Sequence, residues 1–344
     1  MREKEPNINN NSCGVALVDL ETVRQEIVSK ETSERAFTHL ILQSRQFVSG
    51  ERSSEFYKGL VEHQSGIVVI NVDSSARRDY EKGFANIQMN GIQESVRFTH
   101  EKYSKIPLIG PYIGRNHVRM ILIGETAYLS SFDFAEPSFD RNELFLKVTQ
   151  PELVQMLKII ALWDFDSPKE NLQQSAGGFD LVFDTGKSSK GYVSRYAESQ
   201  IKQRLNSNFT MWIVSSWCPD ELEGFVNEAS KKGCQVNLLV NRQYEYESLK
   251  KIPFNVTKII SNHHFINKTN KADYLIYNPR QKQIHAKFIL LENGEQYWWL
   301  VGTSNHTRFG PAALTTEIGI AGIDRGIGKG LSRYISDIDK FIVV

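Results

Sequence analysis

One short pattern occurs twice in this chain, and it limits the possible folds more than any other feature. In the second half, His285 is followed by Lys287 and then by an apolar run. The same order occurs 168 residues earlier, where Arg119 follows His117 and precedes another apolar run. A chain with such a repeat is expected to consist of two related halves with the same order of elements.

The match between the two copies continues beyond the apolar run. Gly-Thr-Ser-Asn at 302–305 corresponds to Ser-Ser-Phe-Asp at 130–133 in the first copy. Farther along, Glu143 precedes one strand-like segment and Glu317 precedes another. This shared order indicates a duplication.

Strand, helix and strand follow one another in both halves. Residues 209–240 have the pattern of a buried strand, a helix and a second strand, which is one βαβ unit. Residues 37–72 follow the same plan. We therefore predict an α/β fold with two related domains, at 30–165 and 176–344, after a polar and disordered lead-in at 1–29.

Period-two alternation places His285 and Lys287 on one face of a predicted strand. The apolar residues between and after them occupy the other face: Ile284, Ala286, Phe288 and Leu290. A turn at Asn293–Gly294 leads to a second strand, at the end of which Asn305 follows. A histidine, a lysine and an amide donor form a cluster suited to binding an anion.

With these residues in this order, the chain resembles the phospholipase D superfamily from about residue 35 onward. The second half matches the superfamily motif at His285, Lys287, Thr303, Asn305 and Glu317. The stretch RNHVRMILIGETAYLSS, around the first histidine, is most similar to bacterial cardiolipin synthases. The resemblance implies two phospholipase D-like α/β sandwich lobes packed about a pseudo-twofold axis, with one composite active site. It also implies a phosphohistidine intermediate, with no metal and no cofactor.

The first motif departs from the superfamily pattern. Arg119 replaces lysine, Ser130 replaces glycine and Asp133 replaces asparagine, whereas His117 is retained. Asp133 supplies a hydrogen-bond acceptor where a donor is expected, which weakens the predicted anion binding by this half. An active first motif and a degenerate one, which binds phosphate without turnover, therefore both remain open.

Cleavage of a phosphodiester gives the histidines and cations distinct roles. One of His117 and His285 would attack phosphorus, and the other would protonate the leaving group. Lys287 and Arg119 would hold the non-bridging oxygens, with Asn305 as a further donor.

The remaining motif residues are expected around this centre. Thr303 and Asp133 are predicted to lie beside the substrate phosphate. Glu143 and Glu317 are each predicted to bond the histidine of the other half and fix its tautomer. The adjacent His263 and His264 suggest a metal pair, but no third ligand lies nearby in the sequence, so we predict no metal site.

The substrate is expected to be a phospholipid, with nucleic acid as the alternative. An apolar and basic segment at 100–115 directly precedes His117 and would suit a lipid head group, although packing against the first half would explain it equally. Residues 171–344 carry a net charge of +5 within a chain of +1, which favours nucleic acid only weakly. No obligate protein partner is expected.

Cysteine usage and hydropathy predict the location of the protein. Three cysteines without CxxC spacing favour a reducing compartment. No segment approaches the roughly 18 consecutive apolar residues of a membrane span. We therefore expect a cytoplasmic protein that meets a membrane only peripherally, at its surface.

Overall fold

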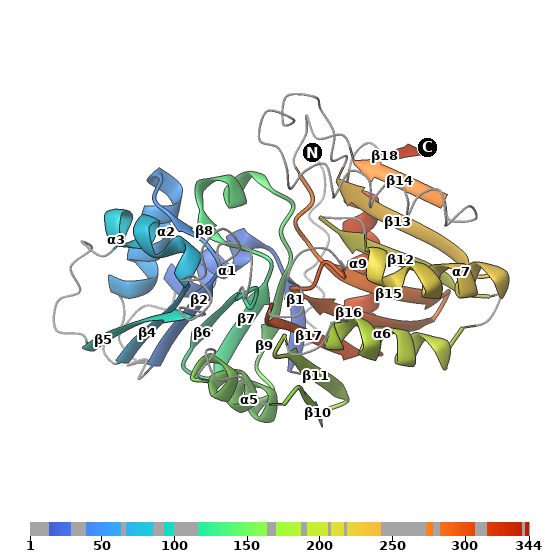
Figure 1. Cartoon of the computed structure of the whole chain (residues 1–344), viewed down its shortest axis with the longest axis horizontal. Helices are drawn as coiled ribbons and strands as arrows, with labels where there is room; N and C mark the ends of the chain where they lie inside the picture. The colour runs from blue at the N-terminus through green and yellow to red at the C-terminus, as the bar shows by residue number, and fades with distance from the viewer. Residues whose placement is uncertain are drawn as a thin grey trace, which may run out of the picture.

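The structure is a computed structural model, and it describes residues 14–28, 39–62, 67–84, 93–99, 116–163, 170–186, 191–205, 208–216, 219–241, 273–277, 283–306, 315–338 and 341–343. All structural statements below refer to these residues. Two β-sheets lie side by side, each with helices against it (Figure 1).

The first sheet has seven strands in the order β1-β9-β7-β6-β2-β4-β5. Its three strands β2, β4 and β5 are parallel, and the other neighbours pair antiparallel. The strands are β1 (Val15–Val18), β2 (His39–Ser44), β4 (Ile67–Asp73), β5 (Gln93–Thr99), β6 (Met120–Ile123), β7 (Thr126–Ser130) and β9 (Phe145–Val148).

The second sheet has nine strands in the order β10-β11-β17-β16-β15-β12-β13-β14-β18. The strands are β10 (Leu172–Ala176), β11 (Phe179–Asp184), β12 (Thr210–Ser215), β13 (Gln235–Asn241), β14 (Asp273–Tyr277), β15 (Phe288–Asn293), β16 (Gln296–Gly302), β17 (Glu317–Gly322) and β18 (Phe341–Val343). The series β9-β7-β6-β2-β4-β5 of the first sheet reappears as β17-β16-β15-β12-β13-β14. This repetition confirms the predicted two-lobed α/β fold.

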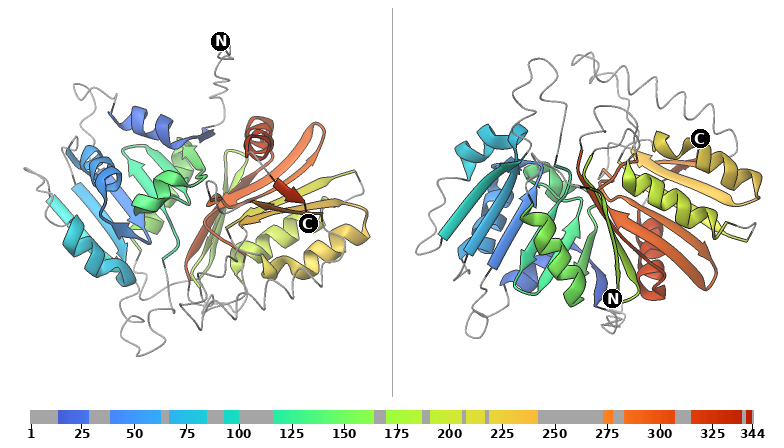
Figure 2. Two further views of the ribbon diagram at one scale, coloured as in Figure 1. Left: turned by 90° about the horizontal axis from the view of Figure 1, so that it is seen from above. Right: turned by 60° about the horizontal axis from the view of Figure 1, so that its bottom comes forward.

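Helices pack on the faces of both sheets (Figure 2). In the first lobe, α1 (Leu20–Val28), α2 (Glu51–Glu62) and α3 (Arg77–Gly83) share one face, and α5 (Pro151–Ala161) packs on the other. In the second lobe, α6 (Tyr192–Lys202) and α7 (Glu223–Lys231) share one face, and α9 (Arg325–Asp337) packs on the other. Apolar residues four apart give α9 its buried stripe: Ile327, Leu331 and Ile335.

The faces that carry α5 and α9 contribute to one apolar core shared by the two lobes. This cluster joins Leu122 and Leu146 of the first sheet to Leu290 and Ile320 of the second. Each lobe also has a second cluster of its own, under α2 and α3 or under α6 and α7. A shared core holds the two lobes in one relative position, as a site built from both of them requires.

Strand register shows which residues of the two lobes are equivalent. On β2, Gln43 lies opposite Met120 of β6. On β12, Val214 lies opposite Phe288 of β15. Because β6 and β15 both follow the repeated histidines at the same distance, Gln43 corresponds to Val214. The next residues therefore correspond as well, so that Ser44 matches Ser215 and Arg45 matches Ser216.

Two local predictions differ from the structure. Residues 1–29 were expected to be a disordered lead-in, but Val15–Val18 pair with β9 and Val23 of α1 is fully buried. The few apolar residues of this segment pack against the rest of the lobe only after folding. The prediction relied on the polar composition of the segment and therefore missed this packing. The strand expected to hold His285 and Lys287 begins at Phe288, which places both residues in the extended segment just before it.

The shared core predicts that the two lobes unfold together. Phe183 is fully buried in this core and packs edge-on against Trp163, with ring centroids 5.1 Å apart. We expect Phe183→Ala to lower the free energy of unfolding by about 3–5 kcal/mol and to leave a single calorimetric transition. Phe47→Ala, in the cluster confined to the first lobe, is the matched control and should also give one transition. Two separate transitions, with only one displaced in each variant, would contradict a shared core.

Candidate active site between the lobes

The two lobes meet where the segment before each repeated histidine crosses the segment before a glutamate of the other lobe. The two contacts are parallel bridges between Asn116 and Thr316 and between Asn142 and Ile284. The histidines extend them, because His117 N donates to the Thr316 carbonyl (3.1 Å) and His285 N donates to that of Asn142 (3.0 Å). Each lobe therefore fixes the backbone that carries the histidine of the other.

The histidine side chains are held by the same crossing. His117 Nδ1 lies 2.8 Å from Glu317 Oε1, and His285 Nδ1 lies 2.7 Å from Glu143 Oε1. Both cross-lobe pairs are those expected from the sequence. A carboxylate on Nδ1 favours the tautomer that carries its proton there, which assigns any chemistry with a ligand to Nε2. The imidazole side chains of His117 and His285 are 16% and 14% exposed, and Nε2 of His117 is itself buried.

A hydroxyl group orients each glutamate. The hydroxyl of Thr303, which the sequence predicts to lie beside the substrate phosphate, donates to Glu317 Oε2 at 2.6 Å and accepts a bond from Ile318 N. In the first lobe, the Ser131 hydroxyl donates to Glu143 Oε2 at 2.5 Å. Ser131 was not singled out from the sequence, although its alignment with Thr303 contained the signal.

The cation of the second lobe is buried beside its histidine. Lys287 is 3% exposed, and its Nζ donates to the carbonyl of His285 at 2.8 Å. Burial, with the positive charge of Arg119 nearby, lowers the pKa of Lys287 below its usual range. Burial raises the pKa of Glu143. An anionic ligand would raise the pKa of Lys287, because a negative charge beside Lys287 favours the ammonium form.

The imidazole of His285 is kept neutral by its surroundings. Burial lowers its pKa well below the ordinary value, and the charges of Lys287 and Arg119 act in the same direction. A neutral ring at physiological pH is the form that can act as a nucleophile or base.

The cation of the first lobe, Arg119, is paired with a carboxylate of the same lobe. Arg119 Nε donates to Asp133 Oδ1 at 2.7 Å, and both side chains are 3% exposed. Arg119 Nη1 also donates to the carbonyl of His117. Burial disfavours both charges, but their attraction dominates, so the pKa of Asp133 lies below its usual range and that of Arg119 above it. Asp133 is therefore the counterion of Arg119.

The equivalent position in the second lobe carries no charge. Asn305 Oδ1 accepts a bond from the Ser215 hydroxyl at 3.2 Å. Asp133 Oδ1 accepts the corresponding bond from Ser44 at 3.0 Å. This contact holds the Oδ1 side of the Asn305 amide against Ser215.

A buried polar network supports His117 from within the first lobe. The backbone N of Asn116 donates to Asp73 Oδ2 at 2.7 Å, and its side-chain oxygen accepts from Gln43 at 3.0 Å. Thr316 of the other lobe donates to the same oxygen at 3.3 Å. Asn116 thus links the two lobes directly before the histidine. The sequence offered no signal for this role beyond its position.

Several predictions fall outside the described residues. They concern the segment 100–115 and the pair His263 and His264. Within the described ranges, no group of three or more histidine, cysteine, aspartate or glutamate side chains is arranged to hold a metal ion. In the same ranges, no helix is both long and apolar enough to cross a membrane.

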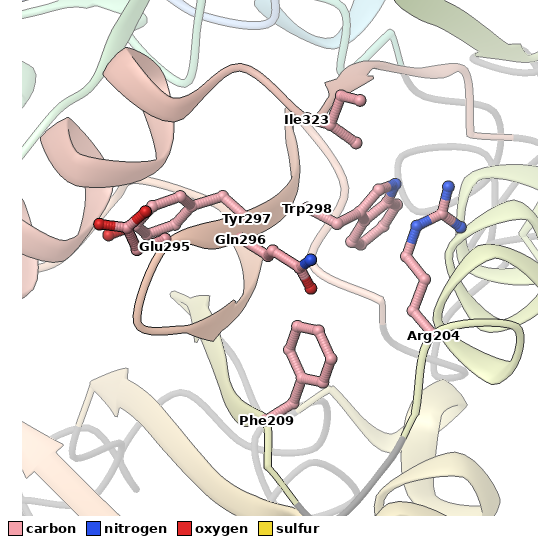
Figure 3. Close-up of a pocket in the computed structure, with 7 residues that line it drawn as sticks. All are labelled: Arg204, Phe209, Glu295, Gln296, Tyr297, Trp298 and Ile323. Carbon is pink, nitrogen blue, oxygen red and sulfur yellow. The ribbon is translucent and has the colours of Figure 1, made fainter.

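A separate groove of about 360 Å³ lies in the second lobe, and Figure 3 shows the side chains that line it. It contains Glu295 to Trp298, at the turn where β15 leads into β16, together with Arg204, Phe209 and Ile323. His285 precedes the opposite end of β15. The groove is therefore not part of the histidine site.

Comparison with known proteins identifies the fold. No protein-family model and no curated protein sequence matches the chain. Among solved structures, it is similar to phosphatidylserine synthase of Haemophilus influenzae Rd KW20, with a TM-score of 0.67 at 12% identity, over 96% of this chain and 87% of the other. It is also similar to polyphosphate kinase of Porphyromonas gingivalis, with a TM-score of 0.60 at 12% identity, over 96% of this chain and 48% of that kinase. At these identities, the similarity establishes the fold.

The buried Arg119–Asp133 pair makes a prediction about stability. Arg119→Met or Asp133→Asn alone leaves a buried charge without its counterion and should lower the free energy of unfolding by about 3–5 kcal/mol. The double variant removes both charges and should cost less than either single change. Urea denaturation of the four proteins measures the coupling.

An exposed ion pair provides the control. Arg52 and Asp140 pair at 2.7 Å with side chains 43% and 68% exposed, and the same cycle on Arg52→Met and Asp140→Asn should give a coupling below about 1 kcal/mol. Additive effects of Arg119→Met and Asp133→Asn would contradict the assignment of Asp133 as a counterion.

Proposed function

We propose that this chain, which has the two-lobed fold of the phospholipase D superfamily, cleaves phosphodiesters through a covalent histidine intermediate. The observation that carries this proposal is the reciprocal pairing of His117 with Glu317 (2.8 Å) and of His285 with Glu143 (2.7 Å). Two oriented imidazoles at one lobe interface would supply a nucleophile and a general acid for the same phosphate.

The reaction would proceed in two displacements. In the first, Nε2 of one histidine attacks phosphorus, an N–P bond forms, and the P–O bond to the leaving group breaks. The other histidine enters this step as the imidazolium, gives its Nε2 proton to the departing oxygen and becomes neutral. In the second, this histidine removes a proton from water or from an acceptor alcohol, whose oxygen attacks phosphorus and breaks the N–P bond. The first histidine is thereby regenerated.

Buried positive charge would stabilise the phosphoryl oxygens in both steps. Lys287 lies two residues from His285 and is buried beside it, where an electrostatic contact is stronger than in water. The oriented amide of Asn305 would add a hydrogen bond. The paired glutamates would stabilise the imidazolium that forms on each ring.

A phospholipid is the proposed substrate class. Its support comes from the sequence, in the cardiolipin-synthase-like stretch around His117 and the apolar, basic segment at 100–115 that precedes it. The basic bias of the second half makes nucleic acid the second candidate. Transfer to an alcohol and hydrolysis by water would use the same residues.

Loss of either histidine should abolish turnover. We expect His285→Ala and His117→Ala each to reduce kcat on a small soluble phosphodiester, bis(4-nitrophenyl) phosphate, by at least about 10³-fold. Circular dichroism and urea denaturation should show both variants folded. Arg204→Ser, in the separate groove, serves as the control with an unchanged rate. Wild-type turnover in His117→Ala would refute a composite site and favour two second lobes acting as a dimer.

A substrate panel with and without chelator separates the remaining alternatives. Vesicles of phosphatidylglycerol should be cleaved faster than phosphatidylcholine or DNA, and excess chelator should leave the rate unchanged because Lys287 supplies the positive charge. Activity that a divalent ion restores would contradict metal-free catalysis. Cleavage of DNA alone, with affinity that falls steeply with salt, would replace phospholipid by nucleic acid. Phosphate binding without turnover of any substrate would identify a degenerate binding module.

A further inference from the structure

The turn that carries Asn305 has an unusual backbone conformation. Among the residues that the structure describes, His306 is the one non-glycine residue with a positive φ, at 53°. Residues other than glycine seldom adopt this left-handed region, and their surroundings hold those that do. Asn305 is partly exposed between Ser304 and His306, which are both buried. The direction in which the turn presents Asn305 therefore depends on the contacts of His306.

Three segments of the second lobe contact His306. Within the turn, its backbone N donates to the Ser304 hydroxyl at 3.1 Å. Its carbonyl accepts a bond at 2.9 Å from the backbone N of Glu221, in the short 3-10 helix η4 (Asp220–Leu222). Its imidazole Nδ1 lies 2.9 Å from the hydroxyl oxygen of Ser194, in the first turn of α6. The backbone and the side chain of His306 are thus attached to two elements outside the turn.

A chain of hydrogen bonds fixes the imidazole of His306. The Ser194 hydroxyl donates to Glu221 Oε2, which leaves its oxygen as an acceptor toward His306. Nδ1 of His306 is therefore the donor, and the chain runs from His306 through Ser194 to Glu221. Glu221 Oε1 also accepts from the backbone N of Gly191, the residue before α6, at 3.1 Å. Ser194 is fully buried and Glu221 is 3% exposed, so a broken link would leave a polar group unsatisfied away from water.

The equivalent turn of the first lobe is held in another way. Phe134 occupies the position of His306 in the repeat. It lies in strand β8 (Phe134–Ala135), which pairs with β3 (Phe47–Val48), and its ring stacks on that of Phe47 with centroids 5.0 Å apart. Strand pairing and apolar packing therefore fix the turn of the first lobe. The turn of the second lobe lies beyond the end of β16 and depends on the hydrogen bonds of His306.

We propose that His306, held by Ser194 and Glu221, positions Asn305 for binding a phosphate. Ser215 supplies a second anchor for Asn305, because its hydroxyl lies 3.2 Å from Asn305 Oδ1 and 3.3 Å from the Asn305 carbonyl oxygen. The proposal rests on the proposed function in one respect, that the amide of Asn305 binds a phosphate. His306 is then a positioning residue, which acts through Asn305 and contacts no substrate itself.

Four variants separate the hydrogen bond of His306 from its ring and its backbone. His306→Phe keeps a planar ring, as the first lobe does, and removes the donor. His306→Asn retains a side-chain donor and tolerates a positive φ. Ser194→Ala removes the acceptor. Ser199→Ala is the matched control, because Ser199 lies exposed on the same helix and its hydroxyl donates only locally, to the Tyr196 carbonyl at 2.8 Å.

Calorimetric titration with inorganic phosphate measures the effect on binding. His306→Phe and Ser194→Ala should each raise the Kd of phosphate by about tenfold, the loss expected when one hydrogen bond to an anion is misplaced. His306→Asn should keep the Kd within about threefold of the wild-type value, because its donor can replace Nδ1. Ser199→Ala should leave the Kd unchanged.

A second substitution distinguishes positioning from general damage to the fold. Asn305→Ala should also raise the Kd of phosphate by about tenfold. Adding His306→Phe to it should change the Kd by less than about twofold, because the residue that His306 positions is already absent. A substitution that merely loosens the lobe would weaken binding in both backgrounds. Ser194→Ala in the Asn305→Ala protein gives the same test if His306→Phe is too unstable to titrate.

The outcomes also distinguish the role of His306 from the proposed function. The expected pattern of Kd values in a protein that turns over no phosphodiester would support His306 and refute the catalytic proposal. Equal effects of His306→Phe with and without Asn305 would overturn the positioning role, as would a wild-type Kd in His306→Phe or Ser194→Ala. A wild-type Kd in Asn305→Ala, or absence of phosphate binding by the wild type, would overturn it directly.

Discussion

The reciprocal contact between the lobes is the constraint on which the site depends. Neither lobe completes its own histidine–glutamate pair, because His117 reaches Glu317 and His285 reaches Glu143. The backbone bridges at Asn116–Thr316 and Asn142–Ile284 hold these pairs in register. A site assembled this way tolerates little relative motion of the lobes, and the apolar core that joins both sheets supplies the necessary rigidity.

Because the charged residues around the histidines are buried, each charge needs a counterion or a ligand of opposite charge. Lys287, Arg119 and Asp133 are each only 2–3% exposed, so that an uncompensated charge among them is costly. The lobes meet this cost differently. In the first, Asp133 neutralises Arg119 within the protein. In the second, Asn305 leaves Lys287 without a counterion at that position, a state that an anionic ligand would stabilise. The two halves of the site therefore differ in how their cations are balanced.

The two halves also show which features of the duplication withstood divergence. The hydroxyl that orients each glutamate is present in both, as Ser131 and Thr303. The hydroxyl at the end of the central strand is present in both as well, where Ser44 and Ser215 bond equivalent residues. Differences concentrate on the cations and their counterions, so that geometry was kept while charge was redistributed.

The sequence by itself determined the duplication, the α/β class, the positions of both histidines and, through the family resemblance, their cross-lobe glutamates. These follow from local periodicity and from residue order, which a single chain displays directly. Only the tertiary structure decided that Thr303 bonds Glu317, that Asp133 bonds Arg119, and that Val15–Val18 completes a sheet. In each case the partner of a polar group or strand edge depends on which atoms folding brings together. The spacing of residues in the sequence does not specify these contacts.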